Sequence, residues 1–143
     1  MDASVAAMWQ LRDEEHVAAA AGLLQDFREG HIRLIAPVHL KFEVPSAIRK
    51  AWRTGRVTEE QARRAIAVFL RWNVPTVDDD DLITAAFEYT VQFGCSLYDG
   101  LYLALAERIA CPFIFADGRL RNAIRGRFPL ALWLPDYTLA AER

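Results

Sequence analysis

Apolar and polar positions along the chain follow the periods of helices and of short buried strands. Residues 15–29 place apolar side chains three and four positions apart before Gly30, which predicts an amphipathic helix. Further helices are predicted over residues 38–53, 58–72, 82–93 and 96–110, the third of them after the acidic run 78–81. Short apolar runs predict strands at residues 32–36, 74–77, 113–116 and 130–134, with a short arginine-rich helix after residue 116.

Two of these helices have recognisable starts. Thr58 is followed three positions later by Gln61, and Ser96 is followed by Asp99, which is the spacing of a capping box. The helix that begins at Ser96 is apolar on nearly every side, and such a helix is typically central and buried.

The order of the elements predicts the fold class. Strands alternate with helices, and the crossovers are long enough for parallel pairing. We therefore expect an α/β fold, a three-layer sandwich with a short, mostly parallel central sheet flanked by helices, in a single domain over residues 1–143. Asp2 lies where a first strand would end, yet only Met1 precedes it. The first strand is therefore expected to be very short, or to begin upstream of this sequence.

Composition narrows the function classes. A net charge of −2 argues against a protein that coats nucleic acid by bulk charge. No apolar run reaches the roughly 18 residues of a membrane span, and early acids argue against a secretory signal, so we expect a cytoplasmic protein. Cys95 and Cys111 show no metal-ligand spacing and are expected to be reduced, buried thiols.

The arginines and histidines have less specific patterns. Four arginines lie close together near the C-terminal end, and we expect them either to form a solvated helix face or to contact phosphate. They are Arg119, Arg121, Arg125 and Arg127. The histidines have no motif spacing and are expected to be surface or packing residues, namely His16, His31 and His39.

Four acids are predicted at one end of the sheet. In open parallel sheets, ligands bind at the carboxyl ends of the strands. Asp2 follows the first strand position, Asp117 directly follows strand 113–116, Glu43 lies on the helix after strand 32–36, and Asp99 lies in the first turn of the buried helix. Mutually repelling carboxylates at one place predict a divalent cation.

Each acid also has a structural alternative. Asp99 is placed to complete a capping box, Asp117 to be the N-cap of the next helix, and Asp2 to be a solvated terminal residue. Glu43 shares a helical face with core positions, so a purely structural role is harder to assign to it.

The chemistry of such a site follows from its ligands. Oxygen ligands without a His or Cys partner select Mg²⁺ or Mn²⁺, which support hydrolysis of phosphate esters. A glycine-rich phosphate loop, a nucleophile elbow and an HExxH motif are all missing from the sequence.

Four segments, in this order, resemble the motifs of the PIN-domain endoribonucleases, in particular the bacterial VapC-like toxins of type II toxin–antitoxin systems. The segments are Asp2 to Ser4, Ala36 to Val44, Ser96 to Ala106 and Phe115 to Leu120, and the resemblance covers nearly the whole chain. Each motif alone is unspecific, whereas the four together at this spacing are a strong signal.

The resemblance implies that Asp2, Glu43, Asp99 and Asp117 hold one or two Mg²⁺ or Mn²⁺ ions and cleave RNA, single-stranded or structured, with Ser4 assisting by hydrogen bonding. It also implies a homodimer and a small cognate antitoxin that wraps the toxin and fills its site. The chain departs from the family pattern at Phe115, an aromatic residue expected beside the site. It also departs at Pro45, which predicts that Glu43 is presented from a kinked or late-starting helix.

Two rival functions fit the sequence less well. A non-catalytic PIN-like scaffold that binds RNA or protein would have no need to hold four repelling acids together. Another Mg²⁺-dependent α/β enzyme, such as a phosphatase or a phospho-receiver domain, needs a nucleophilic aspartate and a well-placed lysine. The chain has only Lys41 and Lys50, both on the Glu43 helix, and no paired DxD motif.

Overall fold

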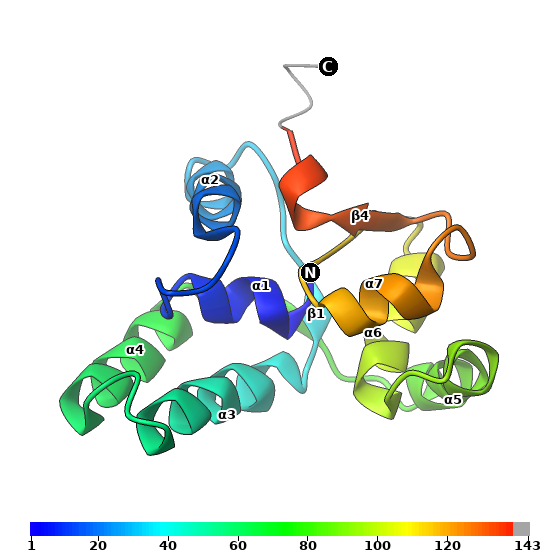
Figure 1. The fold of residues 1–143 in the computed structure, drawn as a ribbon. Coiled ribbons are helices and arrows are strands. Elements are labelled where there is room, and N and C mark those ends of the chain that lie inside the picture. Colours follow the sequence, from blue (N-terminus) through cyan, green and yellow to red (C-terminus); the bar gives the residue numbers. More distant parts are fainter. Residues whose placement is uncertain (139–143) are drawn as a thin grey trace.

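Short parallel strands lie at the centre of the molecule with helices around them in this computed structural model, which describes residues 1–138 (Figure 1). The α/β sandwich predicted from the sequence is confirmed, although the last five residues of the predicted domain, 139–143, lie outside the described part. The elements are α1 (Ala3–Met8), α2 (Val17–Arg28), β1 (Ala36–Pro37), α3 (Leu40–Arg53), α4 (Glu59–Arg71), β2 (Thr76–Val77), α5 (Asp81–Phe93), α6 (Leu97–Arg108), β3 (Phe113–Phe115), α7 (Gly118–Ile124), β4 (Ala131–Trp133) and a 3₁₀ turn, η1 (Leu134–Asp136).

The first two residues join two parallel strand pairs. β1 pairs with β2, and β3 pairs with β4, each pair in parallel. The amino group of Met1 donates a hydrogen bond to the carbonyl of Ile35 at 3.1 Å, and the backbone N–H of Asp2 donates to Ile114 at 2.9 Å. Met1 and Asp2 therefore occupy the place of the first strand, between the β1 and β3 sides.

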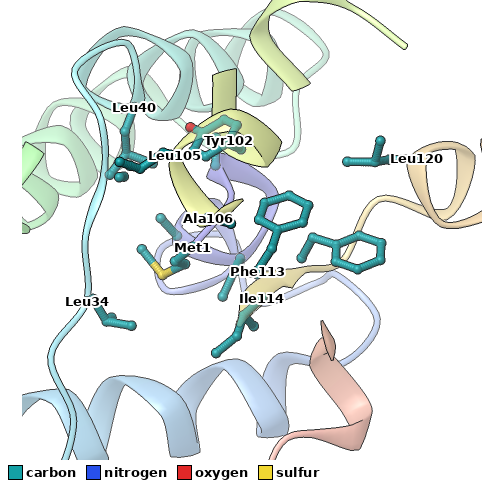
Figure 2. Close-up of a cluster of buried hydrophobic side chains, with 14 of the residues drawn as sticks. Met1, Leu34, Leu40, Tyr102, Leu105, Ala106, Phe113, Ile114 and Leu120 are labelled. Atoms are coloured by element: carbon teal, nitrogen blue, oxygen red, sulfur yellow. The ribbon is translucent and has the colours of Figure 1, made fainter. Parts of the chain in front are cut away.

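The buried helix predicted after Ser96 is confirmed as α6. Its side chains at Tyr102, Leu103 and Leu105 are at most 3% exposed. Figure 2 shows Tyr102, Leu105 and Ala106 gathered with Met1 and residues of β3, among other buried side chains of the core. The core therefore holds α6 directly against the strand ends that lead to the predicted site.

α5 and α6 approach each other closely at a glycine. A Cβ built on Gly100 would lie 2.4 Å from the carbonyl oxygen of Ala86, which is a backbone atom of α5 and cannot rotate away. Only glycine fits this crossing without moving the helices apart. Gly100 thereby fixes the start of α6 and the neighbouring Asp99.

Strand lengths differ from the prediction. The runs 32–36 and 74–77 contribute only the two-residue strands β1 and β2, and the other two strands have three residues each. The remaining apolar residues of these runs pack into the core without pairing in a strand. An apolar run therefore predicts that its residues are buried better than it predicts that they form a β-strand.

Two helices also differ from the expectation. α1 was not predicted, because six residues, ASVAAM, are too short to show a helical period. α3 begins at Leu40, which places Glu43 in its first turn, and it includes Pro45 within its length. The prediction that α3 starts late was therefore wrong: the turn before Pro45 is closed by hydrogen bonds from Phe42 and Glu43 to the His39 carbonyl.

α3 and α4 lie side by side as a helical hairpin, and α1 lies between α2 and α3 (Figure 1). Within residues 1–138, every helix is too short or too polar to cross a bilayer.

Candidate metal and nuclease site

Asp2 is the buried member of the acidic group. It is 5% exposed, caps α1, and accepts hydrogen bonds from the backbone N–H of Ser4, at 3.1 Å, and from the Ser4 hydroxyl. Burial raises the pKa of Asp2 to about 6; the charges of Glu43 and Asp99 act in the same direction, while the Ser4 hydrogen bonds oppose the shift. The alternative that Asp2 is a solvated terminal residue is wrong.

Ser4 ties this acid to the segment that leads to Asp117. Besides donating to Asp2, its hydroxyl accepts a hydrogen bond from the backbone N–H of Ala116 at 3.0 Å. Ala116 lies between strand β3 and Asp117, so Ser4 connects the first acid to the last across more than a hundred residues of sequence.

Two side chains lie against the carboxylate of Glu43, and one of them donates a hydrogen bond to it. The hydroxyl of Tyr102 donates to its Oε1 at 3.0 Å, and Nε2 of His39, one turn earlier on the chain, lies 3.0 Å from the same oxygen. Burial raises the pKa of the Tyr102 hydroxyl far above its usual range, so this group stays protonated and serves as a donor. Tyr102 also lies within electrostatic reach of Asp2, which places Glu43 and Asp2 on one side of α6.

Asp99 and Asp117 line one cleft. The side chain of Asp99 accepts from the backbone N–H and the hydroxyl of Ser96, in the predicted capping box. Asp117 caps α7 by accepting from the backbone N–H groups of Arg119 and Leu120. Further residues that line the same cleft are Gly94, Cys95, Ser96, Arg119, Leu120 and Ala123.

Asp2 lies within electrostatic reach of Glu43 and Asp99, and Asp99 lines one cleft together with Asp117, so the four acids belong to one region of the molecule. They are not in contact as a tight cage. Among residues 1–138, three potential ligand atoms within 4.8 Å of one another are found for Asp26, Glu29 and His31, a separate exposed cluster at the end of α2. No three of the four acids, all of which lie in the described part of the chain, bring ligand atoms within 4.8 Å of one another.

Such spacing still suits Mg²⁺ or Mn²⁺. Mg²⁺ gives up its water reluctantly and is commonly held by one or two carboxylates while it keeps several waters. The donors are oxygens alone, and the buried Asp2 facing two other acids is a charge arrangement that a divalent cation stabilises. The residues present therefore fit such an ion.

His39 was expected to be a surface or packing residue, and its contacts give it a place at the site. It is 9% exposed, its ring lies 5.3 Å from that of Tyr98 and 4.7 Å from that of Tyr102, and it touches Glu43. The spacing of His39 and Glu43, four residues apart on one helix face, was the available signal. Tyr102 gave no signal, because its contact with Glu43 spans 59 residues of sequence.

Other predictions are corrected by burial. Phe115 is 2% exposed and stacks on Phe113 at 5.1 Å, so it faces the core and not the acids. Both cysteines are free thiols, as expected, but Cys95 is only half-buried and Cys111 is exposed.

The clustered arginines have different roles. Arg121 covers the ring of Trp133 at 4.5 Å, and Arg127 covers Phe93 at 4.8 Å, so both serve packing. Arg119 alone of the four lines the acidic cleft. Phosphate contact stays a prediction, and Arg119 is the member of the cluster whose position suits it.

Comparison with known proteins connects this geometry to a family. The family model described as PIN domain matches residues 1–125. VapC ribonuclease Mb0985 of Mycobacterium bovis and Ribonuclease VapC9 of Mycobacterium tuberculosis are each 29% identical to this chain over 119 residues, which cover 80% of the chain and 92% of either relative. Ribonuclease VapC1 of Mycobacterium tuberculosis is 35% identical over 92 residues, which cover 62% of this chain and 65% of that protein.

Proposed function

Since this chain belongs to the PIN domain family, we propose that it is an endoribonuclease dependent on Mg²⁺ or Mn²⁺ that acts as the toxin of a toxin–antitoxin pair. The observation that carries the proposal is the buried Asp2 beside Glu43 and Asp99, with Asp99 and Asp117 lining one cleft. The similarity to proteins named as VapC ribonucleases supports RNA as the substrate.

The chain's own residues have separate tasks in this mechanism. Asp2, Glu43, Asp99 and Asp117 would hold one or two such ions and thereby position a phosphate of the RNA. When bound, Mg²⁺ or Mn²⁺ supplies an activated water nucleophile and stabilises charge on the leaving oxygen.

Two neighbours orient the ligands. Ser4 fixes the Asp2 carboxylate by two hydrogen bonds, and Tyr102 fixes that of Glu43 by one. Ligands oriented before the ion arrives lower the entropic cost of assembling the site.

A cognate antitoxin is proposed to dock in the groove between α3 and α4. Apolar side chains of Phe42, Trp52 and Ile66 line this groove, and Lys41 and Arg49 contribute positive charge at it. Arg63 also lines the groove, but it is paired with Glu59 at 2.6 Å. Phe42 is 69% exposed and directly precedes Glu43, so a segment in the groove would end at the site. An amphipathic partner helix with acids beside its apolar stripe has the matching chemistry.

A homodimer is proposed through α5. Its residues Ile83, Phe87 and Val91 recur every four positions and are 48%, 59% and 69% exposed, which forms an apolar stripe on one helix face. Exposed stripes of this kind mark interaction surfaces.

Cleavage of a single-stranded RNA in Mg²⁺ or Mn²⁺ tests the proposal, with EDTA and Glu43→Gln as controls. The proposal expects cleavage that requires the ion and falls by orders of magnitude in the variant. Cleavage that persists in EDTA, or wild-type activity of Glu43→Gln, would refute it.

A further inference from the structure

An exposed aromatic ring stands at the edge of the acidic site. Tyr98 directly precedes Asp99 in the first turn of α6, and 57% of its surface is exposed. Large exposed apolar side chains normally need an explanation only when their position suggests a partner. Tyr98 adjoins two of the four acids, since it neighbours Asp99 in sequence and its ring lies 5.3 Å from that of His39, which touches Glu43.

The ring of Tyr98 packs against buried aromatic rings. His39 is buried and packs between Tyr98 and Tyr102, whose own ring stacks on Phe113 of the core at 6.0 Å. A continuous series of rings therefore connects Tyr98 to the core. A supported ring with an exposed surface loses little freedom when a flat ligand stacks on it.

A cation lines the same cleft as Asp99. Arg119 is exposed, lines the cleft with Asp99 and Asp117, and within residues 1–138 its side chain forms no ion pair. Its guanidinium has the geometry and charge to bind a phosphate. Arg121 and Arg127, on the same segment, are already placed on aromatic rings.

We propose that Tyr98 is a stacking platform for one nucleobase of the RNA and that Arg119 binds a phosphate of the same strand. This inference rests on the proposed nuclease function, and it names the substrate class as RNA with an unpaired, unstacked base beside the cleaved bond. Within a duplex, both faces of a base are already covered by its neighbours, so the base cannot reach Tyr98.

The stacking arm of the test compares Tyr98→Leu with Tyr98→Phe. Stacking of one base contributes roughly 1–3 kcal/mol, so Tyr98→Leu should raise Kd and KM for a single-stranded oligoribonucleotide by about 5- to 150-fold, with a smaller change in kcat. Tyr98→Phe keeps the ring and should retain affinity within about twofold. Leu70→Ala is the control, because Leu70 is similarly exposed, at 54%, but lies on α4, away from the acids and from the proposed interfaces.

The phosphate arm compares Arg119→Gln with Arg125→Gln, a nearby exposed arginine at the end of α7. Loss of one phosphate contact to a single strand should lower the slope of log K against log salt concentration by about 0.7. We expect this change in Arg119→Gln and not in Arg125→Gln. Equal effects in both variants would mean diffuse attraction and would overturn the assignment of Arg119.

Kd is measured by fluorescence polarisation in Ca²⁺ or EDTA, and KM and kcat by cleavage in Mn²⁺. Wild-type cleavage together with unchanged Kd in Tyr98→Leu overturns the platform while leaving the nuclease function in place. Wild-type protein that neither binds nor cleaves RNA overturns both. Equal loss in Tyr98→Leu and Tyr98→Phe, or a preference for duplex over single strand, also overturns the platform.

Discussion

Asp2→Asn should stabilise the ion-free protein at neutral pH while it abolishes RNA cleavage. Burial raises the pKa of Asp2 from 3.8 to about 6, helped by the charges of Glu43 and Asp99. One pKa unit corresponds to about 1.4 kcal/mol, so the ionised Asp2 costs the folded state up to about 3 kcal/mol at neutral pH. For a domain of this size, each kcal/mol shifts Tm by roughly 3 °C.

The contribution of Asp2 to the free energy of unfolding depends on pH in a defined direction. The folded state binds the proton of Asp2 more tightly than the unfolded state does, so this group favours folding below about pH 4. Its contribution is lost as the pH rises through about 6, the folded-state pKa. The difference in Tm between Asp2→Asn and wild type should therefore be small near pH 4 and should grow by several degrees up to pH 7 or so.

The pH trend of this difference is more informative than its value at any one pH. The asparagine keeps an oxygen that accepts from the backbone N–H of Ser4, but its amide nitrogen costs about 1–3 kcal/mol if it finds no acceptor. That cost is independent of pH and leaves the trend intact.

The assay is thermal melting in EDTA between pH 4 and pH 8, with RNA cleavage in Mn²⁺ measured in parallel. Asp80→Asn is the control, because Asp80 is exposed and its side chain makes no capping hydrogen bond to α5. We expect this control to follow wild type at every pH. A Tm difference for Asp2→Asn that does not change with pH, or wild-type cleavage by that variant, would refute the reasoning.

Three further predictions follow from single residues. Asp99→Asn keeps the capping oxygen and removes the charge, so melting should hold or rise slightly while RNA cleavage falls by orders of magnitude; a variant that melts lower and still cuts RNA would mean that Asp99 is only a cap. Gly100→Ala should cost roughly 1–3 kcal/mol in a denaturant titration, because its Cβ would meet the Ala86 carbonyl. Gly22→Ala in α2, with nothing within 4 Å of the added Cβ, should instead stabilise by about 0.5–1 kcal/mol, and equal effects would contradict the account of the α5–α6 crossing. Phe87→Glu should convert a dimer to a monomer in light scattering with unchanged circular dichroism; a wild-type monomer at high concentration would contradict the α5 interface.

Local sequence signals predicted the local features of this fold. The two capping boxes, at Thr58 and Ser96, form as their spacing indicates, because both partners lie within one turn. The buried character of α6 was also readable, since it depends only on which faces are apolar. Helix α1 was missed, because its shape depends on the surrounding core and not on a period within six residues.

Contacts between distant segments were not predictable in the same way. The Tyr102 hydroxyl reaches Glu43, and the Ser4 hydroxyl accepts from Ala116, only because α6, α3, α1 and β3 meet at one place. The positions of the four acids were predicted from a general rule about strand ends, whereas the side chains that orient them come from the tertiary packing.

The sequence left cap and ligand as competing roles for Asp99 and Asp117, and the structure makes them compatible. Asp2 and Asp117 are N-caps, Asp99 is the third residue of α6, and Glu43 lies in the first turn of α3. Four helices thus begin at the site, each with an acid at its start. Backbone N–H groups and the positive end of a helix dipole favour a carboxylate there, which reduces the repulsion among acids held close together. Capping therefore stabilises three of the four carboxylates, those of Asp2, Asp99 and Asp117, whereas Glu43 relies on the hydrogen bond from the Tyr102 hydroxyl.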